Sequence, residues 1–521
     1  MTQLAGRMAA LSGWRRLLLA FLLGALMSLG FAPFHLFPVF WIGFGGLLLL
    51  LRGVHRGRAA FALGWWFGWG HFIAGLYWIA SAFLVEPDKF AWMVPFPVLG
   101  LPALLALFPA IAVWLAWRLS GPGTFRLFLL AASWTLAEVA RGEVMTGFPW
   151  NLAGYGFGFA DAAMQPAAWI GTVGLSFLAV LAGGAPSLAL VGRGHWRAPV
   201  AIVLGTLVLI GAGAWRLSDA TPDNAAADAP TIRIVQANIA QRDKWRPDRI
   251  ETNFARNLAM SLPSAAERMP DLVIWPETAA TFRINADLTA RQRIAQVADR
   301  INGLVITGAP RAEVGADTVR FFNSAVAINP EAQIIDSADK RHLVPFGEYL
   351  PFRDLLSRVG LDKLAQGRGD FSPGAGGNDG LLHLPGLPPA RVLICYEVIF
   401  ADEVATGDSR PGWLLSLTND AWFGTLTGPD QHFAMARFRA VEQGLPLVRA
   451  AGTGISAIVD AYGQVQSRLD LGVSGVLTGT LPGHAQETLY ASVGRWPIIL
   501  GICMLLVVSL ITMITGMRRE T

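Results

Sequence analysis

The chain has 521 residues, about three times the usual length of a domain, so a single small domain is excluded. Hydrophobic residues make up 53% of the chain and charged residues 15%, against roughly 25% charged residues in an ordinary soluble domain, which excludes a disordered chain and disfavours a purely soluble one. The formal net charge of +4 gives no reason to expect a nucleic-acid partner, and the two cysteines, Cys395 and Cys503, exclude a disulfide framework.

Long apolar stretches recur through the first 216 residues and return near the C-terminus. Most of them approach the ~20 residues that a helix needs to cross a bilayer. We predict eight membrane spans, at residues 17–34, 37–51, 59–83, 90–117, 125–140, 162–191, 198–215 and 496–515. The basic stretch before the first span resembles a signal peptide, but no clear small-residue cleavage site follows it, so we expect an uncleaved anchor.

Arginine residues gather in alternate short loops between these spans. They precede the first span and follow the second, fourth, sixth and eighth, whereas the other short loops are poor in positive charge. Since such charge stays on the cytoplasmic side, both termini are predicted to be cytoplasmic and residues 217–495 to lie outside the cytoplasm. His71, in the third span, is a candidate functional group because ionisable residues are rare in membranes. A role in helix packing is the alternative.

The sequence pattern changes after residue 216. Residues 217–230, rich in Ala, Asp and Pro, are predicted to form a linker. We then predict strands at 231–238, 272–275, 304–308, 324–328, 391–396, 413–417, 447–450 and 455–460, and helices at 249–262, 288–301 and 431–443. This alternation predicts a layered α/β domain at 231–489. It lies between a transmembrane domain at 1–216 and a final span with its tail at 490–521.

Cys395 follows Arg391 and the apolar residues 392–394. A thiol at the carboxyl end of a strand is presented to a crevice. A free cysteine is more often a buried small hydrophobe, which is the alternative here. An unpaired cysteine outside the cytoplasm risks oxidation, so its presence favours a reactive role as a nucleophile.

A cysteine nucleophile needs a base to take its proton and a cation to hold the oxyanion of its acyl intermediate. Glu277 follows another short predicted strand and is a candidate base. Lys340 is a candidate cation, since a compact ammonium can stabilise both a thiolate and an oxyanion, and it is one of only four lysines among 41 basic residues. Taken singly, Glu277 and Lys340 are each typical of surface charges.

Three segments carry a resemblance to a known family: WPET at 275–278, DKRHLVPFGEY at 339–349 and ICYE at 394–397. They closely resemble the catalytic segments of the apolipoprotein N-acyltransferase family. That family looks like a nitrilase-type Glu-Lys-Cys domain inserted before the last of eight membrane spans. The lysine segment is highly specific, whereas WPE alone indicates only the wider nitrilase superfamily. The resemblance extends over essentially the whole chain.

The resemblance implies a polytopic α-helical membrane domain and an extracytoplasmic nitrilase-like α/β domain, an αββα sandwich. It implies that Glu277 is the general base, Lys340 the stabiliser of oxyanion and thiolate, and Cys395 the nucleophile. It also implies supporting or substrate-binding roles, which fall on Trp245, Glu348, Tyr396 and Glu397. For Tyr396 and Glu397 the alternative is structural support, and for Trp245 it is a lid or core aromatic.

The chemistry of the family is a two-step acyl transfer in the bacterial inner membrane. A phospholipid is the acyl donor, a cysteine thioester is the intermediate, and the α-amine of a diacylglyceryl-cysteine on an apolipoprotein is the acceptor. The resemblance thus implies the lipid bilayer and an apolipoprotein as partners, a monomer, and a periplasmic catalytic domain. No cofactor or metal is expected, because the eight histidines lack zinc-ligand spacing and residues 154–159 do not complete a dinucleotide fingerprint.

Two rival functions stay open at this point. A membrane-tethered amidase of the nitrilase type would pass through the same thioester with water as the acceptor, although the spans and the lysine segment favour the transferase. A non-catalytic transporter or lipid-binding protein would use the outer domain only to capture a ligand. Such a protein would not need the Cys395 thiol.

Overall fold

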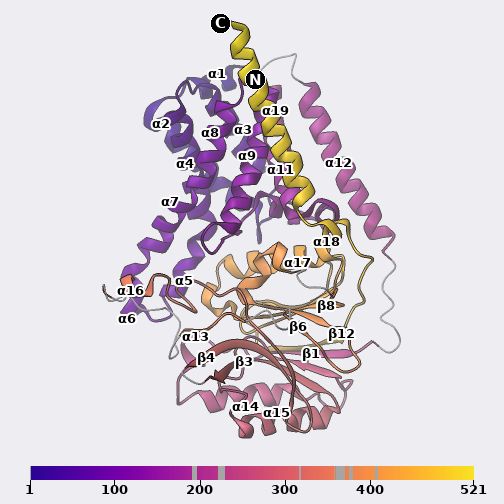
Figure 1. The fold of residues 1–521 in the computed structure, drawn as a ribbon. Helices are drawn as coiled ribbons and strands as arrows, with labels where there is room; N and C mark the ends of the chain where they lie inside the picture. The colour runs from indigo at the N-terminus through magenta and orange to yellow at the C-terminus, as the bar shows by residue number, and fades with distance from the viewer. Residues whose placement is uncertain are drawn as a thin grey trace. The chain divides into compact units, whose positions relative to one another are not determined.

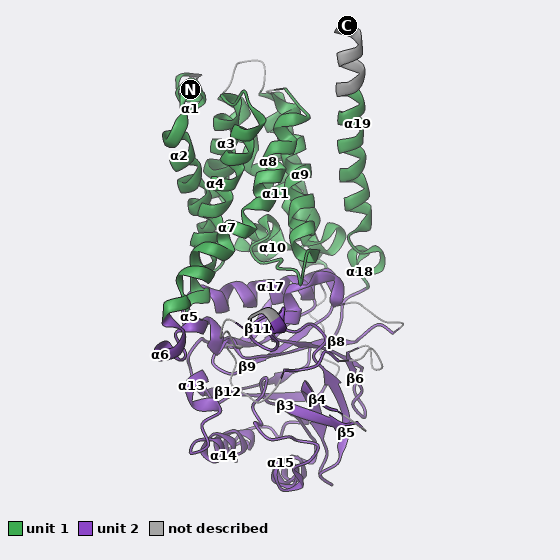
Figure 2. Ribbon diagram, turned by 60° about the vertical axis from the view of Figure 1, so that its left-hand side comes forward, with its two compact units in different colours: residues 1–80, 92–219, 487–521 green, residues 81–91, 220–486 purple. Residues whose placement is uncertain are grey.

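The computed structural model describes residues 2–520 apart from 122, 191–195, 221–228, 316–317, 357, 359–369, 375–379 and 405–408. The chain forms two compact units (Figure 2). Unit 1 comprises residues 1–80, 92–219 and 487–521, and unit 2 comprises residues 81–91 and 220–486. Most of the predicted linker lies outside the described residues, and the domain limits given above stay a prediction.

Unit 1 is built from helices (Figure 1). The longer ones are α2 (Gly13–Met27), α3 (Val39–Arg52), α4 (Gly57–Leu76), α8 (Leu107–Arg118), α9 (Thr124–Glu143), α11 (Ala167–Ala189), α12 (Arg197–Ser218) and α19 (Trp496–Glu520). The shorter ones are α1 (Thr2–Ala10), α7 (Leu101–Leu105), α10 (Asp161–Met164) and α18 (Leu489–Val493). Each predicted span overlaps one of the longer helices, although the span 90–117 also takes in short helical elements before α8, and the spans 17–34 and 59–83 run past the ends of α2 and α4.

The lengths and hydropathies of these helices support a membrane domain. Within the described chain, the segments long and apolar enough to cross a membrane are Gly13–Gly30, Pro87–Arg118, Ala167–Ala189 and Arg197–Ser218. Helix α3 and residues Trp496–Thr512 are apolar but shorter. Helices α4 and α9 do not meet the same test, and α9 carries both acidic and basic residues. That all eight helices cross the membrane stays a prediction.

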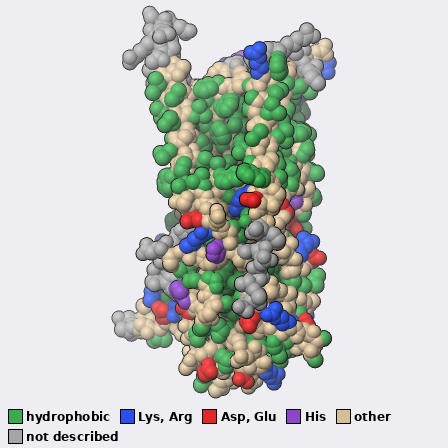
Figure 3. Space-filling view, turned by 90° about the vertical axis from the view of Figure 1, so that its right-hand side faces the viewer, with side chains coloured by type: hydrophobic (Ala, Val, Ile, Leu, Met, Phe, Trp, Pro, Cys, Tyr) green, Lys and Arg blue, Asp and Glu red, His purple; other side chains and the backbone are tan. Residues whose placement is uncertain are grey.

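Hydrophobic side chains cover the outer faces of α12 and α19 (Figure 3). The exposed ones include Val200, Leu204, Leu207 and Val208 on α12, and Leu500, Met504, Val507 and Ile511 on α19. Contiguous apolar surface of this kind is unusual in water and marks contact with lipid or a partner. It is the surface expected of a helix that faces hydrocarbon.

His71 lies buried on α4. Its ring centroid is 5.7 Å from that of Phe31 and 4.9 Å from that of Phe72. These ring contacts are the kind expected if His71 serves in helix packing.

The described residues of unit 2 form two six-stranded sheets. The first sheet has the order β12-β1-β2-β3-β4-β5 and consists of β1 (Thr231–Gln236), β2 (Leu272–Ile274), β3 (Leu304–Val314), β4 (Val319–Ile328), β5 (Ile334–Asp339) and β12 (Gly475–Thr480). The second has the order β11-β10-β9-β8-β7-β6 and consists of β6 (Leu381–Leu382), β7 (Ala390–Ile394), β8 (Trp413–Thr418), β9 (Leu447–Ala451), β10 (Ser456–Val459) and β11 (Val465–Leu469). Strands β1, β2 and β3 run parallel, as do β7, β8 and β9, while the outer strands pair antiparallel.

The two sheets face each other across an apolar core. Residues such as Ile234 and Ile306 of the first sheet share this core with Val392 and Leu415 of the second. Helices α14 (Ile250–Ser261) and α15 (Leu288–Ile301) cover the other face of the first sheet. Helix α17 (Gly428–Gln443) packs against β9 and the turn that follows β7. This confirms the predicted αββα sandwich.

Four strands of unit 2 were not predicted: β5, β6, β11 and β12. They are the four edge strands of the two sheets. An edge strand is covered on fewer sides, and β5, β11 and β12 are accordingly half-buried or exposed along most of their length. Their sequences therefore lack the apolar run by which the central strands were recognised. The short helices of this unit are α5 (Ala80–Phe83), α6 (Pro87–Phe90), α13 (Gln241–Lys244) and α16 (Arg353–Leu356).

Candidate active site

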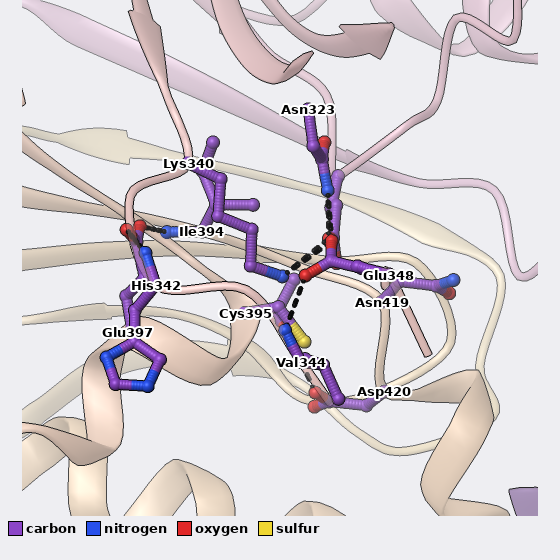
Figure 4. Close-up of polar contacts among 12 residues, drawn as sticks. Asn323, Lys340, His342, Val344, Glu348, Ile394, Cys395, Glu397, Asn419 and Asp420 are labelled. Atoms are coloured by element: carbon purple, nitrogen blue, oxygen red, sulfur yellow. Dashed lines mark hydrogen bonds and ion pairs between the residues drawn. The ribbon is translucent and has the colours of Figure 1, made fainter. Parts of the chain in front are cut away.

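The three predicted catalytic residues each follow the end of a strand in unit 2. Glu277 comes shortly after β2, Lys340 directly follows β5, and Cys395 directly follows β7. The first two strands belong to one sheet and the third to the other. Figure 4 shows the side chains of Lys340 and Cys395 pointing toward each other, with Glu348 beside the ammonium. The sandwich thus gathers residues that are far apart in the sequence.

Lys340 is buried between two carboxylates. Its Nζ lies 3.0 Å from Glu348 Oε1 and 3.5 Å from Glu277 Oε1. Asn323, on β4, contacts the same two oxygens, because its Nδ2 donates to Glu277 Oε1 at 2.7 Å and to Glu348 Oε1 at 3.0 Å. The other oxygen of Glu348 accepts from the backbone N–H of Val344 at 2.8 Å. The ammonium is therefore held in a fixed place by groups that are themselves fixed.

The pKa values of Lys340 and Cys395 are both raised in the site. Burial alone lowers the pKa of Lys340, but the carboxylates of Glu348 and Glu277 raise it above its ordinary value. Burial raises the pKa of the Cys395 thiol to about 12, with Glu277 acting in the same direction and Lys340 against it. Both shifts favour an ammonium on Lys340 and a protonated thiol on Cys395 at neutral pH. The thiol then needs a base at the moment of attack.

Glu397 connects the segment of Lys340 to the strand of Cys395. Its Oε1 accepts from the backbone N–H groups of Arg341 at 2.7 Å and His342 at 3.1 Å, and its Oε2 accepts from that of Ile394 at 2.7 Å (Figure 4). Burial raises the pKa of the Glu397 carboxyl, while these backbone donors act in the opposite direction. These contacts favour structural support, which is one of the two roles that the sequence left open for Glu397.

Tyr396 lies in a small aromatic cluster. Its ring centroid is 5.5 Å from that of His342 and 5.1 Å from that of Phe400, and the latter two rings stack at 3.8 Å. Trp245 differs, because it is only half-buried after α13, and no hydrogen bond or ring contact among the described residues joins it to the catalytic three. The contacts among the described residues thus join the other predicted site residues, whereas for Trp245 only its chain neighbour Lys244 is bonded to Glu277.

Two residues that contact Glu277 were not predicted. Asn323 is one, and a polar side chain within the apolar run of β4 was the signal available for it. The other is Lys244, whose buried Nζ donates to the backbone oxygen of Glu277 at 2.8 Å. Burial lowers the pKa of Lys244 to about 8, against the attraction of Glu277 and Cys395. The scarcity of lysine in the chain was the signal for this residue, but it drew attention only to Lys340.

Comparisons with known proteins agree over both units. A family model described as the apolipoprotein N-acyltransferase N-terminal domain matches residues 23–185, and one described as carbon-nitrogen hydrolase matches residues 231–490. The chain is 40% identical over 516 residues to the apolipoprotein N-acyltransferase of Rhodopseudomonas palustris, with 95% of each chain covered. It is 42% identical over 504 residues to that of Brucella suis, with 92% of each covered. Among solved structures it is similar to a nitrilase-superfamily protein of Saccharomyces cerevisiae, at 18% identity, with 49% of this chain and 90% of that one covered and a TM-score of 0.34.

Proposed function

The chain belongs to the apolipoprotein N-acyltransferase family and is an enzyme of lipoprotein N-acylation, and we propose that it works through a thioester on Cys395. A membrane phospholipid would supply the acyl chain, and the α-amine of a diacylglyceryl-cysteine would receive it. The observation that carries this mechanism is the Cys395 side chain pointing toward the Lys340 ammonium, which the carboxylates of Glu348 and Glu277 hold in place (Figure 4). The apolar helices of unit 1 suit substrates that are anchored in lipid.

The first step forms the thioester. Glu277 takes the thiol proton, and the sulfur of Cys395 attacks the ester carbonyl of the phospholipid. The carbonyl oxygen becomes an oxyanion, which the Lys340 ammonium stabilises. The bond from the carbonyl carbon to the glycerol oxygen then breaks, the leaving oxygen takes the proton from Glu277, and a lysophospholipid departs. The acyl chain stays on the sulfur.

The second step passes the acyl chain to the acceptor. The neutral α-amine attacks the thioester carbonyl while Glu277 takes a proton from the nitrogen. The carbon–sulfur bond breaks, the amide is released, and the Cys395 thiolate regains its proton from Glu277. Lys340 would stabilise both the second oxyanion and the leaving thiolate. One base and one cation thus serve both steps.

Intact mass spectrometry of the detergent-purified protein tests the first step. The protein is exposed to a diacyl phospholipid without any acceptor, as the wild type and as Cys395→Ala. We expect a mass increase of one acyl chain that hydroxylamine removes and that Cys395→Ala lacks. A wild type that binds the phospholipid but gains no adduct would remove Cys395 as the nucleophile and favour the binding-protein alternative.

Addition of an acceptor to the acylated enzyme separates the transferase from the amidase. A synthetic diacylglyceryl-cysteine peptide should discharge the thioester and gain one acyl chain on its amine. Water should discharge it much more slowly. Rapid release of free fatty acid without the peptide, and no acylated peptide with it, would instead support the hydrolase with water as the acceptor.

We also propose that the enzyme is a monomer in the bacterial inner membrane, with unit 2 in the periplasm and both termini in the cytoplasm. Val314, whose side chain is 82% exposed on unit 2, gives a position to probe. In a Cys503→Ala background, Val314→Cys should react with a membrane-impermeant maleimide in intact spheroplasts as fast as in lysed ones. Labelling only after lysis would place unit 2 in the cytoplasm. Light scattering in detergent would measure the oligomeric state.

A further inference from the structure

A buried polar network lies beneath the proposed nucleophile. Asp420 follows β8, His432 is on α17, Arg449 is on β9, and none of the three has exposed surface. Arg449 Nη2 donates to Asp420 Oδ2 at 2.8 Å and lies 3.0 Å from His432 Nδ1. Asp420 Oδ1 lies 2.9 Å from the same nitrogen and accepts from the Thr418 hydroxyl at 2.7 Å. The three side chains therefore fix one another.

The network reaches Cys395 through the other nitrogen of the histidine. His432 Nε2 lies 3.1 Å from the backbone oxygen of Cys395. A carbonyl oxygen can only accept, so Nε2 must carry a proton for this contact to be a hydrogen bond. Burial and Arg449 lower the pKa of His432, which favours the neutral ring. In the neutral ring Nδ1 accepts from Arg449, and in the charged ring Nδ1 donates to Asp420, so Nε2 carries its proton in either form.

The backbone of Cys395 needs such support. Its φ is +52°, in the left-handed region that residues other than glycine rarely adopt. A conformation of this kind costs about 1–3 kcal/mol and persists only where the surroundings determine it. The hydrogen bond from His432 holds the carbonyl of this same residue, so it acts on the peptide whose torsions set where the thiol points.

A purely structural role accounts poorly for this set of residues. Burial of charged groups costs free energy, and replacement of a buried ionic cluster by apolar side chains is often neutral or stabilising. Buried apolar residues such as Leu415 and Val448 lie beside the three, together with the uncharged Ser416 and Thr418, which hydrogen-bond to them. His432 can donate a hydrogen bond to the backbone oxygen of Cys395, which an apolar side chain in its place could not do.

We propose that His432, oriented by Asp420 and Arg449, is a positioning residue that holds Cys395 in the conformation from which the sulfur attacks. The inference rests on the proposed role of Cys395 as the nucleophile. It assigns no proton transfer to His432, because the residue acts on the backbone of the nucleophile and not on the substrate.

Three variants separate positioning from stability. His432→Leu removes the donor, whereas His432→Gln places an amide N–H where it can reach the same carbonyl. Val441→Ala is the matched control: it creates a buried cavity on the same helix, nine residues or about 13.5 Å further along α17. Melting temperatures of the three variants show how much stability each has lost.

The readout is the rate of acyl-enzyme formation in a single turnover with a diacyl phospholipid in mixed micelles. We expect His432→Leu to lower the rate constant at saturating phospholipid by about 10- to 100-fold. The half-saturating concentration should change by less than about twofold, since no contact with the donor is lost. His432→Gln should regain most of the rate, and Val441→Ala should keep it. A folded His432→Leu that reacts as fast as the wild type, or a glutamine variant no faster than leucine, would overturn the inference.

A second measurement keeps this inference apart from the proposed function. Alkylation of Cys395 by iodoacetamide, followed by mass spectrometry, reports on the thiol without any lipid. We expect His432→Leu to slow it by about tenfold and Val441→Ala to leave it unchanged. If the wild type forms no acyl adduct, the proposed function fails while this comparison still tests the positioning. Equal alkylation rates in His432→Leu and the wild type would refute the positioning alone.

Discussion

Replacement of Glu348 by glutamine separates the group that holds the lysine from the group that takes the proton. The substitution keeps the shape of the side chain and removes its charge. Glu348 accepts from Lys340 and Asn323 through Oε1 and from Val344 through Oε2. A glutamine has one oxygen for these three donors, and its NH₂ group must face at least one of them.

The size of the effect follows from these contacts. The variant loses one charge-assisted hydrogen bond to the buried ammonium, worth about 1.5–3 kcal/mol. Lys340 keeps Glu277 at 3.5 Å, so it stays charged but less firmly placed. If this loss falls on the transition state, acylation slows by about 10- to 100-fold, since each 1.36 kcal/mol is a factor of ten. Loss of a general base in Glu277→Gln should cost more, about 10²- to 10⁴-fold.

The assay is the single-turnover rate of acyl-enzyme formation for the wild type, Glu348→Gln and Glu277→Gln. We expect the order wild type, Glu348→Gln, Glu277→Gln, from fastest to slowest. A Glu348→Gln variant as slow as Glu277→Gln would show that Glu348 takes part in proton transfer. A variant as fast as the wild type would show that Lys340 does not need the second carboxylate, and either result would refute the reasoning above.

Three further predictions concern the same site. Lys340→Arg should slow acylation by about 10²- to 10³-fold while phospholipid still binds, because a planar guanidinium cannot replace the compact ammonium at the oxyanion; a rate near that of the wild type would contradict this. Glu277→Gln should lower the pKa of the Cys395 thiol from about 12, because the carboxylate that disfavours the thiolate is gone. Iodoacetamide labelling of this variant should therefore begin at lower pH than in the wild type, and an onset at equal or higher pH would argue against that charge effect. Glu397→Gln should lower the free energy of unfolding by about 1–3 kcal/mol, because its single oxygen leaves a backbone donor without an acceptor; an unchanged denaturation midpoint would count against this.

The sequence allowed the central architecture and the catalytic segments to be predicted. The inner strands of both sheets are short apolar runs, and α14 and α15 have helical periodicity, so each could be recognised locally. Glu277 and Cys395 could be placed because each follows such a strand, and a side chain at the carboxyl end of a strand is presented to a crevice. Lys340 was placed by the scarcity of lysine and by its motif and not by a predicted strand, because it follows β5, an edge strand that the apolar pattern did not reveal.

The groups that orient the site could not be predicted in the same way. Asp420, His432 and Arg449 lie on three different elements, and each in isolation is typical of a surface charge. Their burial follows from the packing of α17 on the second sheet, which no local pattern encodes. The role of Lys244 could not be predicted for a similar reason. Its hydrogen-bond partner is the backbone oxygen of Glu277, and no charged partner could be recognised in the sequence.

Asn323 shows how strand pairing sets the geometry of the catalytic lysine. Ser324 of β4 pairs with Asp339 of β5, so the next pair along the ladder is Asn323 with Lys340. The backbone N–H of Lys340 donates to the backbone oxygen of Asn323 at 2.8 Å, while the Asn323 side chain donates to both Glu277 and Glu348. One residue thus holds the lysine by its backbone and the two carboxylates by its amide. A slip of one residue in this pairing would turn the lysine to the other face of the sheet. The register between β4 and β5 is therefore as much a part of the site as the three side chains that carry the chemistry.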